Sequence, residues 1–106
     1  MTYDIVLSAL ADPTRRQIFG LLRGGARSVN ALAAQLPVSR PAVSQHLKIL
    51  KEAGLVSDQR DGARRLYRLD RAGLAAMRAW LEPFWEEVTA AFNEEWERQL
   101  HDRMNT

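Results

Sequence analysis

Residues 28–54, SVNALAAQLPVSRPAVSQHLKILKEAG, decide the fold of this 106-residue chain. Ser28 and Ser39 each precede apolar residues at helical spacing, and a serine hydroxyl readily accepts a hydrogen bond from the free amides that open a helix. Pro37 ends the first helix, because proline disfavours helical geometry at the residue before it. The segment therefore predicts two short helices joined by a tight turn at Pro37 and Val38.

The second predicted helix has one apolar side and one polar side. At about 100° per residue, Val43, Leu47 and Leu50 share a side that must be buried. The opposite side carries small or polar side chains: Pro41, Ser44, Gln45 and Lys48. Such a surface suits base edges and phosphates, with glutamine reading adenine and lysine pairing with guanine or a phosphate. The pattern is typical of a helix-turn-helix, whose second helix enters the major groove of DNA. The alternative for the same side is an ordinary solvated helix surface.

Further DNA contacts are predicted around this helix. Ser39 and Arg40 lie at its N-terminal end, which a groove-reading helix usually presents to DNA. His46 lies at the edge of the apolar side. It would either contact a phosphate or pack as a histidine bonded to a neighbouring residue.

Residues 55–69 predict a β-hairpin directly after the two helices. Asp61-Gly62 separates two extended runs, and this pair favours a tight hairpin turn in which both central residues have positive φ. Three arginines surround the predicted turn: Arg60, Arg64 and Arg65. A basic hairpin in this place is a wing that reaches flanking phosphates or the minor groove, a task suited to the permanent charge of arginine. The alternative role of such charges is protection of the strand edge against aggregation.

Four stretches of the chain carry a family resemblance: ALADPTRRQI (9–18), VSRPAVSQHLKIL (38–50), AGLV (53–56) and RLYRL (65–69). In this order and spacing, they resemble the ArsR-type (ArsR/SmtB-like) winged helix-turn-helix transcriptional regulators over nearly the whole chain. The resemblance implies a homodimeric repressor on a palindromic operator, often released by an effector. It also implies that the recognition residues are Ser39, Arg40, Ser44, Gln45, His46 and Lys48.

Charge is divided unevenly along the chain. Residues 1–70 hold 11 Lys and Arg against 6 Asp and Glu, whereas residues 71–106 hold 4 against 7. A DNA-binding part followed by a separate assembly element would give this asymmetry. The length fits a single domain, residues 1–106, mainly α-helical with five or six helices and a small β-hairpin. No apolar run is long enough to span a membrane and no signal peptide opens the chain, so a cytoplasmic protein is expected.

The two ends of the chain, residues 1–22 and 71–103, are predicted to be dimerisation helices. Asp12 and Pro13 open a helix near the N-terminus, with a short helix before it, and Asp70 would cap a long C-terminal helix. Apolar residues then follow at steps of three and four: Leu74, Met77, Leu81, Phe84 or Trp85, Val88, Phe92, Trp96 and Leu100. Pro83 predicts a kink, or a break into two helices, at residues 79–82.

This apolar series is longer than the core of a small domain needs, and aromatic anchors are common at protein interfaces. We therefore expect a homodimer through the first and last helices. The predicted interface residues are Leu7, Leu10, Leu81, Phe84, Trp85, Val88, Phe92 and Trp96. The alternative is a tail that folds back as additional core.

The chain has no cysteine, which excludes a thiol-based metal site or disulfide switch. Many ArsR-type repressors sense metals through cysteines at the start of the helix-turn-helix, but the matching residues 26–30 offer no soft ligand. His101 and Asp102 are adjacent and point about 100° apart on a helix, so they do not converge on one ion. The alternative is a weak site across a dimer that uses Glu97, four residues before His101. We therefore predict no metal site and no cofactor. A small-molecule effector, a partner protein and no effector at all stay open.

Catalysis is not expected. The chain has two histidines far apart in sequence, no glycine-rich phosphate loop and no nucleophile–base arrangement. The predicted function is sequence-specific repression of transcription through double-stranded DNA. The alternative is a winged-helix protein-interaction module that does not bind DNA.

Overall fold

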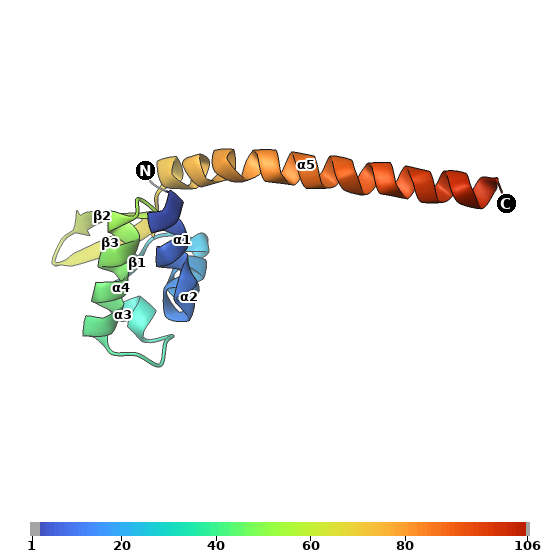
Figure 1. Ribbon diagram of the computed structural model, residues 1–106. Helices are drawn as coiled ribbons and strands as arrows, with labels where there is room; N and C mark the ends of the chain where they lie inside the picture. Colours follow the sequence, from blue (N-terminus) through green and yellow to red (C-terminus); the bar gives the residue numbers. More distant parts are fainter. Residues whose placement is uncertain (1–2, 106) are drawn as a thin grey trace. The chain divides into compact units, whose positions relative to one another are not determined.

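The computed structural model describes residues 3–105 (Figure 1). In chain order its elements are α1 (Tyr3–Ala11), α2 (Pro13–Leu21), the 3₁₀ turn η1 (Leu22–Gly24), β1 (Arg27–Ser28), α3 (Val29–Ala33), α4 (Arg40–Glu52), β2 (Val56–Asp61), β3 (Arg64–Leu69) and α5 (Arg71–Met104). The predicted fold, mainly helical with a winged helix-turn-helix, is confirmed. The chain forms two compact units that divide within α5, between Ala75 and Ala76.

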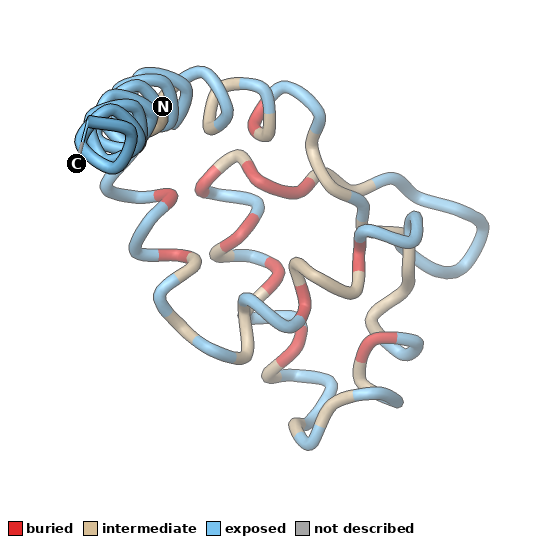
Figure 2. The backbone as a smooth tube through the Cα atoms, turned by 90° about the vertical axis from the view of Figure 1, so that its right-hand side faces the viewer, coloured by how far each residue is buried: buried red, intermediate tan, exposed pale blue. Residues whose placement is uncertain are grey.

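The core of the first unit lies between the inward sides of its helices. Val43, Leu47 and Leu50 of α4 are completely buried, as their helical spacing predicts. They are joined by other buried apolar side chains: Val6, Ile18, Leu22, Leu32, Leu55 and Val56. Figure 2 shows the buried positions on the facing sides of the helices that precede α5. Burying one such side chain stabilises a fold by about 1.5–3 kcal/mol. The packing of its apolar side therefore holds α4 in one orientation against the core.

Capping side chains set the helix starts predicted from the sequence. The side chains of Asp12, Ser28 and Ser39 each accept a hydrogen bond from the backbone N–H three residues later, at 2.9, 3.1 and 3.3 Å. Asp70 accepts in the same way from the amide of Gly73, at 3.0 Å. Because an alanine at such a position typically costs about 1 kcal/mol, these four side chains fix where α2, α3, α4 and α5 begin.

α3 is shorter than predicted. It ends at Ala33, so the expected stop at Pro37 and the two-residue turn after it are both wrong. The amides of Gln35 and Leu36 bond to carbonyls three residues earlier, so the chain leaves the helix through tighter, 3₁₀-like turns. The link to α4 consequently spans residues 34–39.

The wing belongs to a three-stranded antiparallel sheet in the order β1-β3-β2. The two-residue strand β1 was not predicted, because two residues carry no alternation to detect. It pairs Arg27 with Tyr67 and Ser28 with Leu66. This pairing attaches the start of α3 to the middle of the wing.

The hairpin turn lies one residue later than predicted. Asp61 pairs with Arg64, so the two central residues of the turn are Gly62 and Ala63. Gly62 has φ 64°, and no non-glycine residue in the described part of the chain has positive φ. The predicted turn, with positive φ at both central residues, is therefore wrong. A glycine at the first central position, the only one with positive φ, is typical of a type II′ turn.

α5 continues through Pro83 as a single helix of 34 residues, so the predicted break into two helices is wrong. A proline removes one backbone hydrogen bond, and the long helical segments on both sides of it outweigh that loss. Several of the predicted stripe residues of the second unit are exposed: Leu81, Phe84, Trp85, Val88, Phe92, Trp96 and Leu100. Within residues 3–105, no helix is both long and apolar enough to cross a membrane.

Candidate nucleic-acid interface

α4 presents an exposed polar side opposite its buried one. Pro41, Ser44, Gln45 and Lys48, which we call the recognition face, are all exposed. The complete burial of Val43, Leu47 and Leu50 prevents α4 from rotating this face inward. The hydroxyl, amide and ammonium groups on it supply the donors and acceptors that base edges in the major groove require.

The N-terminal end of α4 holds two more of the predicted DNA contacts. Ser39 and Arg40 are exposed, and the Ser39 hydroxyl caps the helix. Arg40 donates from its guanidinium to the side-chain oxygen of Asn30 in α3, at 3.1 Å. Asn30 was not predicted as part of this site, and its place as the second residue of α3 gives no signal for this role. Because a guanidinium has five N–H donors, Arg40 keeps donors for a phosphate.

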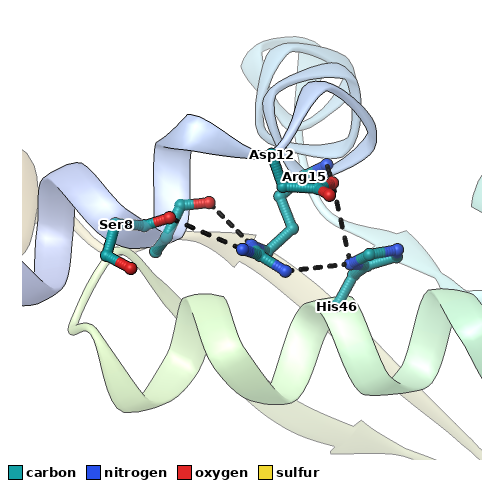
Figure 3. Close-up of polar contacts among 5 residues, drawn as sticks. Ser8, Asp12, Arg15 and His46 are labelled. Carbon is teal, nitrogen blue, oxygen red and sulfur yellow. Dashed lines mark hydrogen bonds and ion pairs between the residues drawn. The ribbon is translucent and has the colours of Figure 1, made fainter.

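His46 faces the junction between α1 and α2 rather than the side of the recognition face (Figure 3). Its Nδ1 lies 3.4 Å from a guanidinium nitrogen of Arg15 and 4.0 Å from Oδ2 of Asp12. Arg15 also donates to the backbone oxygens of Ala9 at 2.7 Å and Ser8 at 3.5 Å. The backbone amide of Arg15 lowers the pKa of the Asp12 carboxyl. These contacts connect α4 to the end of α1, and a phosphate contact from His46 stays a prediction.

The wing carries exposed arginines on both of its sides. Arg60 and Arg65 lie directly opposite each other in the β2–β3 register, so they share one side. Arg64 lies on the other side, opposite Asp61, and its guanidinium is 3.4 Å from the Asp61 carboxylate. Like charges directly opposite each other destabilise a strand pair. On the same side, the Asp58 carboxylate lies 2.6 Å from the Arg65 guanidinium and offsets part of this repulsion.

The folded chain brings the wing tip and the helix-turn-helix to one surface. A cavity of about 210 Å³ lies between the start of α3 and the turn of the wing. Its lining comes from both elements: Ser28, Val29, Asn30, Ala63, Arg64 and Arg65. Residues more than thirty positions apart in sequence thus line one partly basic hollow.

Asp58 on β2 joins the wing to α4. Its Oδ1 lies 2.7 Å from Nζ of Lys51, and its Oδ2 accepts a hydrogen bond of 2.6 Å from Arg65. The Asp58 side chain is only 7% exposed, against 54% for Lys51 and 50% for Arg65. Hydrogen bonds from Lys51 and then Arg65 lower the pKa of this carboxyl. We call these three residues the Asp58 cluster. The strand alternation that puts Asp58 on the side of Val56 is the only sequence signal for it.

Known proteins share this arrangement of elements. A family model described as a helix-turn-helix domain matches residues 10–59. The HTH-type transcriptional regulator Rv2034 of Mycobacterium tuberculosis is 53% identical over 89 residues, which cover 84% of this chain and 83% of that protein. The transcriptional repressor SdpR of Bacillus subtilis is 39% identical over 79 residues, 74% of this chain and 88% of that protein.

A solved structure names the family. Mb0332 from Mycobacterium bovis is described as a homodimeric winged helix-turn-helix DNA-binding domain of a possible ArsR-family transcriptional regulator. It superimposes with a TM-score of 0.66 and 34% identity, over 80% of this chain and 79% of that one. This chain belongs to the ArsR family. The ArsR family consists of DNA-binding transcriptional regulators rather than enzymes.

This ArsR-family chain differs from thiol-sensing members of the family in having no cysteine anywhere in its sequence. In residues 3–105, no cluster of three or more histidine, aspartate or glutamate side chains is placed to hold a metal ion. Residues 26–30, where the family resemblance would place the cysteines of thiol-sensing members, lie around β1. There the Arg27 guanidinium donates to the backbone oxygen of Leu21 at 3.1 Å, which gives this segment a structural contact in place of a ligand.

Proposed function

We propose that this ArsR-family chain is a transcriptional repressor that binds a palindromic operator as a homodimer. The observation that carries the proposal is the orientation of α4. Its apolar side is completely buried, its recognition face is exposed, and a basic wing follows in the same unit. A helix held in this way can insert its polar side into a major groove without repacking the core.

Within this proposal the recognition face reads bases, while the arginines and the helix start contact the backbone. Gln45 and Lys48 carry the groups that hydrogen-bond to purine edges. The positions assigned to phosphates are Ser39, Arg40, Arg60, Arg64 and Arg65. Phosphate contacts orient a protein on the duplex and make its affinity depend on salt, whereas base contacts give specificity. The helix-turn-helix is assigned to residues 28–54 and the wing to residues 55–69.

The dimer is assigned to residues 1–22 and 71–103. In α1, Leu7 is 48% exposed and Leu10 is half-buried. In α5, the apolar stripe presents aromatic side chains to solvent, with Trp85 72% exposed. Apolar surface of this extent usually marks a protein interface. The description of the Mb0332 domain as homodimeric supports a dimer, without naming its interface. A two-fold protein fits a palindromic site whose half-sites lie about one helical turn, ~34 Å, apart.

We infer that this repressor is not released by thiol or metal chemistry, because the sequence supplies no cysteine and residues 3–105 hold no cluster of three or more side chains able to bind a metal ion. Release then requires a small molecule or a protein partner, unless the amount of repressor alone sets the occupancy of the operator. Each of these routes acts on the population of dimers able to bind DNA.

Selection of DNA from a random-sequence pool tests the proposal. The full chain is incubated with duplexes of random sequence at low salt, and the retained duplexes are sequenced. We expect an inverted repeat to emerge. A Gln45→Ala, Lys48→Ala double variant is the matched control and should retain duplexes without enriching that motif. If the wild-type chain retains no duplex even at low salt, the proposal is wrong and the interaction module without DNA binding takes its place.

A further inference from the structure

The Asp58 cluster connects the two elements proposed to contact DNA. Lys51 lies in the last turn of α4, Arg65 lies on β3, and Asp58 lies between them on β2. Each carboxylate oxygen of Asp58 has its own cation, at 2.7 Å and 2.6 Å. Both oxygens are therefore occupied by partners from different elements.

Asp58 lies where the wing leaves the core. Burial along β2 falls from Val56, which is 2% exposed, to Gln59 and the following residues, which are exposed. Beyond that point the hairpin has few apolar contacts to hold its direction. Exposed ion pairs contribute little to stability, but a carboxylate withdrawn from water and bonded to two cations is costly to separate from them. The cluster is thus placed to hold the angle between α4 and the wing.

We propose that Asp58 is a positioning residue for DNA recognition, whose carboxylate holds Lys51 and Arg65 so that α4 and the wing reach one duplex at a fixed separation. The inference rests on the proposed function, because a fixed separation of α4 and the wing matters for binding only if both contact the same DNA duplex. Asp58 itself does not contact the DNA. Its effect is transmitted through the two cations.

The direction in which one substitution changes the affinity for DNA distinguishes a positioning role from a simple effect of charge. A carboxylate close to DNA repels phosphates, so its removal by Asp58→Asn would tighten binding if charge alone mattered. If Asp58 positions the wing, the same change weakens binding, because α4 and the wing then lose their fixed separation. Asp61→Asn is the matched control. It removes the same charge from the same hairpin, at a carboxylate that is 58% exposed and bonded only to the exposed Arg64 at 3.4 Å in the described structure.

The experiment uses the full chain and two probes: a duplex selected by the wild-type protein from the random pool, and a scrambled duplex of the same composition. We expect Asp58→Asn to lose affinity for the selected duplex by about five- to tenfold, and to lose much less for the scrambled one. Asp61→Asn should bind both duplexes as tightly as the wild-type chain, or more tightly. The ratio of the two affinities is a readout that a loss of fold stability alone would not change.

A second variant keeps the inference testable if Asp58→Asn does not fold. Lys51 is 54% exposed, so Lys51→Gln should fold while removing the helix-side partner of Asp58. A lysine that only contacts a phosphate would weaken both duplexes by the same factor, whereas loss of positioning weakens the selected duplex more. If the double variant Asp58→Asn, Lys51→Gln folds, the two substitutions should change the affinity ratio non-additively, because both break the same contact.

Three results would overturn the inference. Asp58→Asn could bind the selected duplex as tightly as Asp61→Asn, Lys51→Gln could leave the affinity ratio unchanged, or the two substitutions could act additively on that ratio. Each would show that Asp58 does not position the wing while DNA binding itself remains. If the wild-type chain binds neither duplex at low salt, the proposed function fails as well. The measured affinity of the wild-type chain for the two duplexes distinguishes these two failures.

Discussion

Gly73, in the first turn of α5, lies directly against the carbonyl oxygen of Gly54, the residue with φ 78° that follows α4. A Cβ atom on Gly73 would overlap this oxygen and would lie 2.9 Å from the carbonyl carbon. Both obstacles are backbone atoms, so no change of side-chain rotamer can relieve the overlap. The close approach therefore requires glycine at position 73.

Gly73→Ala should destabilise the chain. Forcing a methyl group into a filled space typically costs about 1–3 kcal/mol, and here the backbone must move to admit it. The free energy of unfolding, measured with urea, checks the expectation. Gly20→Ala is the control, since a Cβ on this α2 residue meets no atom within 4 Å and should leave stability unchanged or raise it by up to about 1 kcal/mol. Equal unfolding midpoints for Gly73→Ala and the wild-type chain would contradict the close approach.

Gln45 and Arg64 should affect DNA binding in different ways. Gln45→Ala removes a base-reading group and should reduce discrimination at one base position by about 1–3 kcal/mol. Arg64→Ala removes an exposed cation and should weaken selected and scrambled duplexes alike, lowering the dependence of affinity on salt by about one phosphate contact. Titrations at several salt concentrations measure both effects. The assignment of the two surfaces is wrong if Arg64→Ala alters base preference and Gln45→Ala does not.

Trp85→Glu should dissociate the proposed dimer. Trp85 is 72% exposed in the single chain, and a charge placed within an aromatic interface should raise the dimer dissociation constant by roughly tenfold or more. Sedimentation equilibrium gives that constant. Glu87→Lys, also exposed and about 200° around the helix from Trp85, is the control and should stay dimeric. A wild-type chain that is monomeric at the same concentrations would contradict the dimer assignment.

Acid should weaken the fold in part through Asp58. Lys51 and Arg65 depress the pKa of this carboxyl below its ordinary value of 3.8. A depressed pKa adds stability at pH values above 3.8, and that stability is lost as the pH falls below 3.8 through the pKa of the folded state. The free energy of unfolding of the wild-type chain should therefore fall more steeply below pH 3.8 than that of Asp58→Asn. Asp12, whose pKa is also lowered, contributes equally in both proteins and cancels in the comparison. Parallel acid profiles would contradict the role of the ion pairs.

The helix starts were predictable because their signals are local. Asp12, Ser39 and Asp70 act as caps through amides only three residues away, so the sequence around each one contains the whole interaction. The buried side of α4 was predictable for the same reason, since its period lies within one helix. The turn at Gly62 was misplaced by one residue, because the pairing register of the strands, rather than the Asp-Gly pair, sets its position.

The remaining features depend on packing between distant segments. Nothing near Gly73 in the sequence indicates that a Cβ there would meet the carbonyl group of Gly54, and nothing near Asp58 indicates two cations on separate elements. The single helix through Pro83 shows the reverse case, in which a strong local signal is outweighed by the helical residues on both sides. Sequence periodicity thus locates the recognition face, whereas the contacts that hold it in place come from the tertiary structure.

In the proposed dimer, two copies of α4 read two half-sites on one face of the duplex. Inserting half a helical turn, about five base pairs, between the half-sites of the selected operator tests it most directly. The inserted bases would rotate one half-site to the opposite face of the DNA. We predict that the half-turn insertion lowers the affinity to the level of the scrambled duplex. Insertion of a full turn returns both half-sites to one face but moves them further apart, so it restores affinity only if the dimer can span the longer distance. An operator with the half-turn insertion that binds as tightly as the original would contradict the claim.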